Sequence, residues 1–420
     1  MPTYHIWTIG CQMNRAESDR LAGRFEELGY TPVDKPGEAD LIVVNSCVVR
    51  QSAEDRAVNK LHNLRMVKKA NPLARIALTG CLVGTDTKEL GKRFPYVDWF
   101  FQPGEAPPWL DARDGGPLPA RVKVSETIAI SQGCDNFCTY CIVPYRRGRE
   151  RSTPLEAIVG EVGTLVERGA KEVTLLGQNV DSWGRDLPGR PDLADLLAAV
   201  NAVPGLDRVR FLTNHPKDMS RKLIRAIADL DKVCQQINLP AQAGSNEILK
   251  AMRRGYTREQ YLELIERIKT GIPGVSVSTD IIVGFPGETD SQFRETLDLL
   301  KTVKFGTVHV AVYSPREGTV AARDLADDVP PGVKKERLTA VETLQEVVQT
   351  EGNAALLGRT EEVLVEGRSK GKWYGRTRID KLVFFTERRN LKGALVPVEI
   401  TKTSPWSLQG TLVERIKEEQ

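Results

Sequence analysis

The sequence predicts an α/β protein made of a small parallel α/β domain, a partial (βα)6 barrel of the TIM type and a small antiparallel β-barrel. Strand-like and helix-like runs alternate through residues 1–101, as in a parallel sheet. Six further strand–helix units follow in residues 126–357. Residues 358–420 carry short strand-like runs with glycine-containing turns. Residues 102–125, rich in Pro, Gly and Asp up to Ala120, are predicted to be a linker.

The composition is typical of a soluble protein. The 420 residues are 40% hydrophobic and 27% charged, and no run approaches the roughly 18 apolar residues of a membrane span. The N-terminus, Met1–Trp7, lacks the basic-then-apolar order of a signal peptide. Seven cysteines, an odd number, favour reduced thiols used as ligands over a disulfide framework. We therefore expect a cytoplasmic protein without a membrane partner.

The first domain places a cysteine after each of its predicted strands. The expected strands are His5–Ile9, Leu41–Val44 and Ile76–Leu78, and the expected helices are Asn14–Leu28 and Ala53–Lys69. Cys11, Cys47 and Cys81 follow the three strands. Because the carboxyl ends of parallel strands share one edge, these thiols should meet there and form a metal centre. The alternative is that each is a small buried apolar residue at a strand end.

A second cysteine set, Cys134, Cys138 and Cys141, has the spacing Cys-x3-Cys-x2-Cys in the loop that leaves the predicted strand Thr127–Ser131. A four-iron cluster held by three thiolates keeps one iron free for another ligand. A zinc site would need a fourth His or Cys nearby, and no His lies in this loop; a disulfide pair is the other alternative. The spacing favours an iron–sulfur cluster.

This motif resembles that of the radical S-adenosylmethionine (radical SAM) enzymes, which have an aromatic residue before the last cysteine, here Tyr140. The resemblance implies that the free iron chelates the amino and carboxylate groups of SAM. It also implies that Tyr140 lies beside the adenine of SAM.

The central part alternates strands and helices as a partial barrel does. After the strand Thr127–Ser131, the expected strands are Glu172–Leu176, Arg208–Leu212, Val233–Leu239, Val275–Val283 and Thr307–Tyr313. The expected helices are Leu155–Glu167, Leu193–Val203, Ser220–Ala228, Tyr261–Lys269 and Ser291–Thr302. Active sites of such barrels lie on the loops after the strands. Those loops are polar and rich in Gly and Pro, which suits a cavity wall: Gly177–Gly184, Thr213–Pro216, Pro240–Ser245, Gly284–Glu288 and Ser314–Gly318.

The C-terminal part is basic. After a predicted helix, Leu338–Leu357, come three predicted strands, Glu362–Glu366, Leu382–Phe385 and Leu395–Ile400. Between Arg368 and Lys392 there are nine Lys or Arg against two Asp or Glu, a local charge of +7 within a total of +3. These cations, with Trp373 and Tyr374 interleaved, suit RNA, because cations pair with phosphates and aromatic rings stack on bases. They are Arg368, Lys370, Lys372, Arg376, Arg378, Arg388 and Arg389. The alternative is a solvated basic surface around a core aromatic residue.

Over nearly its whole length the chain looks like a methylthiotransferase of the MiaB and RimO superfamily, with a three-cysteine domain, a radical SAM barrel and a C-terminal TRAM domain. The motifs that carry the resemblance include Gly10–Asn14, Cys138–Tyr145, Arg147–Glu150, Leu176–Asn179, Ser278–Glu288 and Tyr313–Arg316. Gln178, Asn179 and Met252–Tyr256 are most similar to the MiaB type. That type methylthiolates carbon 2 of N6-isopentenyladenosine at position 37, beside the tRNA anticodon.

The resemblance implies two [4Fe-4S] clusters, SAM and roles for particular residues. The cluster at Cys134, Cys138 and Cys141 would reduce SAM to a 5′-deoxyadenosyl radical, and a second cluster at Cys11, Cys47 and Cys81 would supply sulfur. SAM would contact Tyr140, Gly284, Glu288, Gln178 and Asn179. Arg147 and Arg149 would pair with the SAM carboxylate or with tRNA phosphates, or they are buried ion-pair partners. A small electron donor of the flavodoxin or ferredoxin type and a monomeric state are expected.

Two other functions remain open from the sequence. A sister methylthiotransferase would act on threonylcarbamoyl-adenosine or on an aspartate of a ribosomal protein. A non-catalytic iron–sulfur protein that binds RNA or senses redox state would not need Tyr140 or the loop Gly284–Glu288. Thr153, Asn214 and Asn238 depart from the family's usual Arg, Pro and His, which bears on substrate contacts. His215 is expected to face the cavity, and Cys234 to lie in the core.

Overall fold

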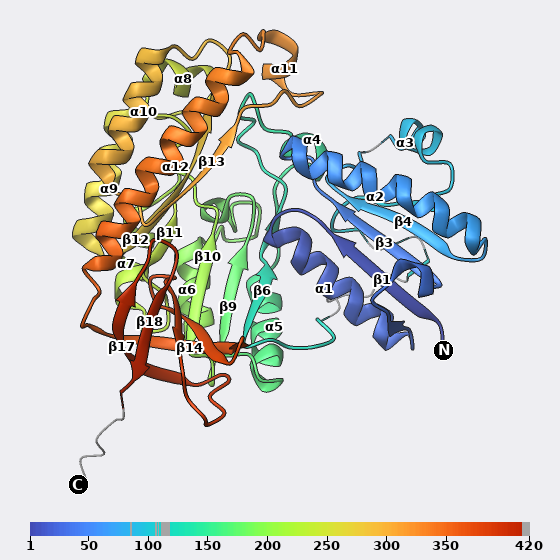
Figure 1. Ribbon diagram of the computed structural model, residues 1–420, viewed down its shortest axis with the longest axis horizontal. Helices are drawn as coiled ribbons and strands as arrows, with labels where there is room; N and C mark the ends of the chain where they lie inside the picture. Colours follow the sequence, from blue (N-terminus) through green and yellow to red (C-terminus); the bar gives the residue numbers. More distant parts are fainter. Residues whose placement is uncertain (85, 106, 108, 111–117, 414–420) are drawn as a thin grey trace.

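The structure is a computed structural model that describes residues 1–84, 86–105, 107, 109–110 and 118–413. Much of the predicted linker, residues 106, 108 and 111–117, and the end of the chain, 414–420, lie outside the described residues. The N-terminal domain lies beside the central barrel, and the C-terminal barrel lies beneath it (Figure 1). No helix in the described part of the chain is long and apolar enough to span a membrane.

The N-terminal domain is a parallel five-stranded sheet of order β2-β1-β3-β4-β5, with helices on both faces. Its strands are β1 (Thr3–Thr8), β2 (Thr31–Pro32), β3 (Leu41–Ser46), β4 (Arg75–Gly80) and β5 (Trp99–Phe100). Its helices are α1 (Gln12–Glu27), η1 (Pro36–Glu38), α2 (Gln51–Ala70) and α3 (Lys88–Arg93). Successive side chains of a strand face opposite sides, so Val43 packs toward α1 and Val44 toward α2. The two edge strands, β2 and β5, are short and were not predicted.

The central part forms two three-stranded parallel sheets, β10-β9-β6 and β11-β12-β13, joined by a parallel bridge between Val209 and Val233. The strands are β6 (Ser125–Ala129), β9 (Glu172–Leu176), β10 (Arg208–Leu212), β11 (Gln236–Asn238), β12 (Ser276–Val283) and β13 (Thr307–Val312). The six strands in chain order make the expected open barrel. The expected strand Val233–Leu239 is ordered as a strand only over its three central residues.

Long helices cover the outside of this barrel, and short ones lie in the loops that follow the strands (Figure 1). The long helices are α5 (Leu155–Glu167), α6 (Leu193–Asn201), α7 (Arg221–Asp229), α9 (Arg258–Gly271), α10 (Asp290–Val303) and α12 (Pro331–Ala354). The short ones are α4 (Val143–Arg147), η2 (Val180–Ser182), α8 (Asn246–Ala251) and α11 (Val320–Asp324). A small hairpin, β7 (Ser131–Gln132) with β8 (Arg151–Ser152), closes the base of the cysteine loop. Capping boxes begin α6, α9 and α10, where Asp192, Thr257 and Thr289 satisfy backbone N–H groups of the first turn.

The C-terminal part is a closed barrel of five strands in the order β14-β15-β16-β18-β17. The strands are β14 (Thr360–Ser369), β15 (Lys372–Thr377), β16 (Leu382–Phe385), β17 (Leu395–Thr403) and β18 (Leu408–Leu412). Its neighbouring strands are antiparallel except for the β16–β18 pair. Strands β15 and β18 were not predicted.

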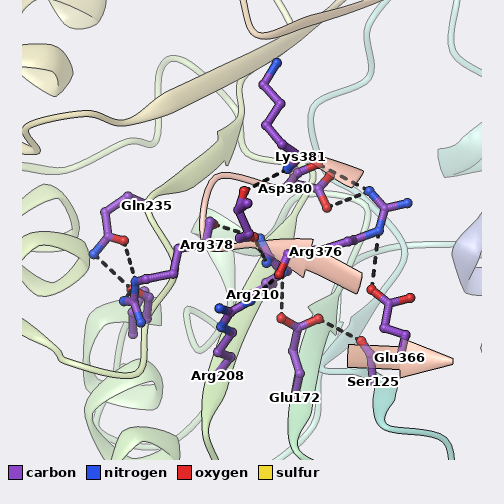
Figure 2. Close-up of polar contacts among 12 residues, drawn as sticks. Ser125, Glu172, Arg208, Arg210, Gln235, Glu366, Arg376, Arg378, Asp380 and Lys381 are labelled. Carbon is purple, nitrogen blue, oxygen red and sulfur yellow. Dashed lines mark hydrogen bonds and ion pairs between the residues drawn. The ribbon is translucent and has the colours of Figure 1, made fainter. Parts of the chain in front are cut away.

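Buried and half-buried arginines attach the C-terminal barrel to the amino-terminal ends of the central strands (Figure 2). Arg210 of β10 donates to Glu172 of β9 at 2.8 Å and to the backbone oxygen of Thr377 at 2.7 Å. The Arg378 guanidinium donates to Gln235 at 2.8 Å and to the Val233 oxygen at 2.6 Å. Since the reaction rim of such a barrel is at the other end of the strands, this attachment fixes the C-terminal barrel away from the rim.

Candidate functional site

Cys11, Cys47 and Cys81 lie at the carboxyl ends of β1, β3 and β4, which are adjacent in the sheet. Burial raises the pKa of the Cys81 thiol to about 11; the guanidinium of Arg147 opposes this increase, and the charges of Cys47 and Cys11 add to it. Burial likewise raises the pKa of Cys47, with a contribution from Cys11. The three thiols therefore lie at one edge of the sheet, near enough for their charges to interact.

The backbone around these thiols is closely packed and leaves little room for a larger side chain. Gly10 has φ +134°, and a Cβ on it would lie 2.8 Å from the Cβ of Cys47. Asn14, fully buried, donates to Asn45 at 2.9 Å and to the Ser46 oxygen at 2.8 Å, which joins the start of α1 to the end of β3. The thiol of Cys11 donates to the Asn14 side-chain oxygen at 3.2 Å.

Arg147 comes from the barrel side but lies among the N-terminal thiols. Its guanidinium donates to Glu17 at 2.5 Å and to Asn14 at 3.4 Å, and its side chain is 2% exposed. A phosphate of a bound RNA has no access to a guanidinium buried in this way. Of the three partners considered for Arg147, the SAM carboxylate, a tRNA phosphate and a buried ion-pair partner, the structure forms the ion pair, with Glu17.

Cys134, Cys138 and Cys141 share a second space at the carboxyl end of β6. Burial raises the pKa of Cys141 to about 12, and the charges of Cys138 and Cys134 add to the increase. The loop is held by Gly133, whose N–H donates to the Gln178 side-chain oxygen at 2.6 Å and whose φ is +82°. Gln178 thus positions the cysteine loop.

The donor sets fit iron–sulfur clusters. All seven cysteines are free thiols, and each trio contains only sulfur ligands. No group of three or more His, Cys, Asp or Glu side chains in the described ranges is arranged to hold a metal ion. Iron–sulfur clusters are held by cysteine thiolates, which is the donor type that each trio supplies. We therefore take each trio as suited to a cluster.

Buried polar atoms without a partner gather on the loops around the Cys134–Cys141 trio. They belong to Ser131, Glu150, Asn179, Asn214, His215 and Gln242, on the loops that follow β6, β9, β10 and β11. Buried polar atoms in folded proteins are normally hydrogen-bonded, so unpaired atoms on the loops of one rim are candidate ligand contacts. The rim is where the sequence predicts the chemistry.

His215 is a neutral donor on this rim. Burial and the charge of Arg254 lower the pKa of His215 to about 2. Its Nδ1 accepts from the N–H of Lys217 at 3.3 Å, so the hydrogen of the neutral ring is on Nε2, which has no partner. Asn214, which replaces the family's Pro, donates to Asp181 at 2.5 Å and so contributes to the loop structure.

The other residues predicted to contact SAM or tRNA form hydrogen bonds or ion pairs within the protein. The buried Glu288 carboxylate accepts from the Gly284 N–H at 2.6 Å and from Arg337 at 2.9 Å, so it shapes its own loop. Asn179 donates to Asp218 at 2.8 Å, while its side-chain oxygen stays unpaired. Arg149 is exposed and pairs with Asp135 at 2.6 Å.

The predicted RNA contacts of the C-terminal barrel separate into two faces. Trp373 is 6% exposed, and its indole donates to the Glu387 oxygen at 3.0 Å, so it belongs to the core and offers little surface to a base. Tyr374, the next residue, faces outward and forms a ring pair with Phe384 at 6.3 Å. Sequence reasoning did not single out Phe384, although strand alternation places it on the face opposite Phe385.

The cations of this barrel are also divided. Arg376 pairs with Asp380 at 2.9 Å and with Glu366 at 3.6 Å, and is therefore engaged within the barrel. Exposed cations lie instead on the β14–β15 turn and the β16–β17 loop, and we call them the basic edge: Arg368, Lys370, Lys372, Arg388, Arg389 and Lys392. Lys372 donates to Gln409 at 3.0 Å.

Comparisons with known proteins agree with this architecture. Residues 3–102 match Uncharacterized protein family UPF0004, residues 128–300 match the Radical SAM superfamily and residues 354–413 match the TRAM domain. A solved radical SAM methyltransferase, TsrM from Kitasatospora setae, has a similar fold, with a TM-score of 0.54, 14% identity and 77% of each chain covered.

Relatives with much higher identity cover the whole chain. A protein of Dehalococcoides mccartyi (strain ATCC BAA-2266 / KCTC 15142 / 195) named tRNA-2-methylthio-N(6)-dimethylallyladenosine synthase is 56% identical over 99% of both chains. A protein of Chloroflexus aurantiacus with the same name is 52% identical over 97% of this chain and 91% of the relative. The chain therefore belongs to the family of tRNA-2-methylthio-N(6)-dimethylallyladenosine synthases, which has a radical SAM domain and a TRAM domain.

Proposed function

We propose that the protein methylthiolates carbon 2 of N6-isopentenyladenosine (N6-dimethylallyladenosine) at position 37 of tRNA, using SAM and two [4Fe-4S] clusters. One observation carries the proposal. Met13 and Ala16, in the first turns of α1, pack on Leu176 together with Ala129 and Leu212, the last residues of β9, β6 and β10. The start of α1, next to Cys11, thus contacts the carboxyl ends of the barrel strands, which supports one rim shared by both trios.

Each part of the chain contributes to positioning in this scheme. The C–H bond at carbon 2 of adenine is neither acidic nor electrophilic, so acid–base side chains cannot activate it. When bound, SAM and its cluster supply the radical chemistry that such a bond needs. Tyr140 and the neutral His215 line the rim, and the Nε2–H of His215 can donate to a ring nitrogen or phosphate oxygen of the ligand.

The second cluster, at Cys11, Cys47 and Cys81, is part of the proposal. Its thiols are held over the rim by ion pairs across the interface, since Arg147 binds Glu17 and Arg316 binds Glu54 at 3.0 Å. Sulfur delivery requires both cysteine sites to face one adenosine. These ion pairs hold the N-terminal domain in a fixed position on the barrel and so fix the position of one site relative to the other. Gly10 and Asn14 hold the thiols in place.

The basic edge and the outward Tyr374–Phe384 pair are the proposed tRNA contacts. They lie on the barrel attached to the amino-terminal ends of the central strands, so at least one five-residue strand, roughly 17 Å, separates them from the rim. A nucleoside alone cannot bridge that distance. The substrate is therefore a folded RNA whose stem contacts the basic edge while one base enters the rim.

The remaining proposals follow from this substrate. A small flavodoxin- or ferredoxin-type protein supplies electrons, the protein acts as a monomer in the cytoplasm, and residues 1–101, 126–357 and 358–420 are its three domains.

The test combines the reconstituted, reduced protein with SAM and tRNA that carries N6-isopentenyladenosine or threonylcarbamoyl-adenosine, followed by nucleoside mass spectrometry. We expect 2-methylthio product only from the isopentenylated tRNA. Product only from the threonylcarbamoyl tRNA would show that the protein has the sister activity instead. Absence of both methylthiolated product and 5′-deoxyadenosine would favour a non-catalytic sensor.

A further inference from the structure

Arg254 is a buried cation beside the Cys134–Cys141 trio. It lies in the turn after α8, is 5% exposed and donates through Nη1 to the sulfur of Cys138 at 3.4 Å. Its Nε donates to the Tyr256 hydroxyl at 3.0 Å and its Nη2 to the Pro240 oxygen at 3.0 Å. The hydrogen bonds fix the guanidinium in one orientation.

The other buried arginines in the described part of the chain all have a carboxylate partner. Ion pairs of 2.5–3.0 Å join Arg147 to Glu17, Arg208 to Glu362, Arg210 to Glu172, Arg316 to Glu54 and Arg337 to Glu288. Arg254, among the described residues, forms no ion pair with Asp or Glu. A buried charge without a counter-charge is costly, so an anion other than an Asp or Glu carboxylate must balance it.

The groups around Arg254 identify the missing anion. Tyr256 and Tyr140, whose hydroxyl lies 3.5 Å from Nη1, are phenols that are ordinarily neutral near pH 7. The Cys138 sulfur is the one contact that becomes an anion when it binds iron, because a coordinating thiol is deprotonated. The guanidinium is thus aimed at a ligand of the cluster.

We propose that Arg254 is the counter-charge of the cluster held by Cys134, Cys138 and Cys141, and that it makes the one-electron reduction of this cluster easier. Reduction adds one negative charge to the cluster, with the electron coming from a low-potential one-electron donor, and no bond or proton changes place. A fixed positive charge that donates a hydrogen bond to a ligand sulfur stabilises the reduced form more than the oxidised form.

The turn that carries Arg254 is attached to the cysteine loop itself. Thr139 donates through its N–H to the Met252 oxygen at 3.1 Å and through its hydroxyl to the Ala251 oxygen at 2.9 Å. Gly255, with φ +72°, allows the chain to reverse. These hydrogen bonds join the turn that carries Arg254 to the loop that carries the cluster ligands, which suits a tuning role.

The test measures the midpoint potential of the cluster by redox titration followed by electron paramagnetic resonance, without tRNA. A chain with Cys11, Cys47 and Cys81 changed to alanine leaves one cluster to observe. In this background we compare Arg254→Gln, Arg254→Lys and the matched control Arg253→Gln, which removes the same charge from the exposed neighbouring residue.

We expect Arg254→Gln to lower the potential by at least 59 mV, a tenfold change in the equilibrium constant for one electron. Arg254→Lys should lower it less, and Arg253→Gln should leave it unchanged. An Arg254→Gln chain with about four irons and an unchanged potential would overturn the proposal. If Arg254→Gln binds no iron, a cluster retained in Arg254→Lys supports the counter-charge role. Loss of the cluster from both variants, when both are folded, contradicts it. Because tRNA is absent, this result is independent of the proposed nucleoside specificity.

Discussion

Replacement of Gly10 by alanine tests the N-terminal thiol site with a single methyl group. The new Cβ would lie 2.8 Å from the Cβ of Cys47 and 3.1 Å from Cγ of Asn14. Carbon atoms in contact normally lie about 3.5–4.0 Å apart, so the atoms of Gly10→Ala and Cys47 must separate by about 0.7–1.2 Å. The φ of +134° adds backbone strain of about 1–3 kcal/mol for a residue with a side chain.

A displacement of this size moves a ligand of the N-terminal cluster while the Cys134–Cys141 trio stays in place. We expect the reconstituted Gly10→Ala protein to hold about four irons instead of about eight. It should still cleave SAM to 5′-deoxyadenosine but form no methylthiolated tRNA. The assays are iron analysis and mass spectrometry of both products.

The matched control is Gly91→Ala in α3 of the same domain, because a Cβ on Gly91 would have no atom within 4 Å. Gly91→Ala should keep the iron content and activity of the unmodified protein. Full iron content and full methylthiolation in Gly10→Ala would refute the reasoning.

Three further predictions concern the other parts of the chain. Cys138→Ala should abolish 5′-deoxyadenosine formation, whereas Cys81→Ala should retain it and lose methylthiolation; equal methylthiolation by the Cys81 variant and the unmodified protein would reject the second-cluster role. Lys370→Gln combined with Lys372→Gln should flatten the dependence of log Kd for tRNA on log salt concentration by about 1–2 units, and an unchanged slope would remove these residues from the interface. Burial raises the pKa of Asp181 to about 7, above the value of about 3.9 in the unfolded chain. Between these two values the native state binds a proton that the unfolded state does not. The contribution of Asp181 to the free energy of unfolding is therefore lost as pH rises from about 4 to about 7. Asp181→Asn should therefore weaken the pH dependence of the urea unfolding free energy between pH 5 and 7, by up to about 1.4 kcal/mol per unit, and an identical dependence in both proteins would contradict the assignment.

The elements that sequence reasoning found are those with strong local signals. The N-terminal cysteines follow continuous apolar runs such as Leu41–Val44, and a buried parallel strand places the next residue at a known edge. The six central strands follow the same logic. The fold class was therefore predictable without any long-range contact.

The missed elements have weak local signals. Strand β15 reads Lys-Trp-Tyr-Gly-Arg-Thr, in which charge and glycine hide the strand pattern, and only pairing with β14 and β16 reveals it. The face that each residue takes depends on this register. Sequence reasoning therefore named Trp373 and Tyr374 together for RNA contact and could not tell that Trp373 is buried while Tyr374 faces outward.

The roles of the buried arginines depend on contacts far apart in the sequence. Arg147 follows the second cysteine motif directly, yet it binds Glu17, 130 residues away, among the first trio of thiols. Arg254 stands in the motif Met252–Tyr256, and its neighbour Arg253 is exposed. Only the packing distinguishes the two arginines, so a sequence pattern could not assign the counter-charge.

The measurement that tests the account most directly is the iron content of three chains after anaerobic reconstitution. The unmodified protein should hold about eight irons, and each of two triple variants, Cys11, Cys47 and Cys81 to alanine or Cys134, Cys138 and Cys141 to alanine, should hold about four. A total of about four irons in the unmodified protein, or no loss of iron from the first triple variant, would contradict the claim that the chain holds two clusters over one rim.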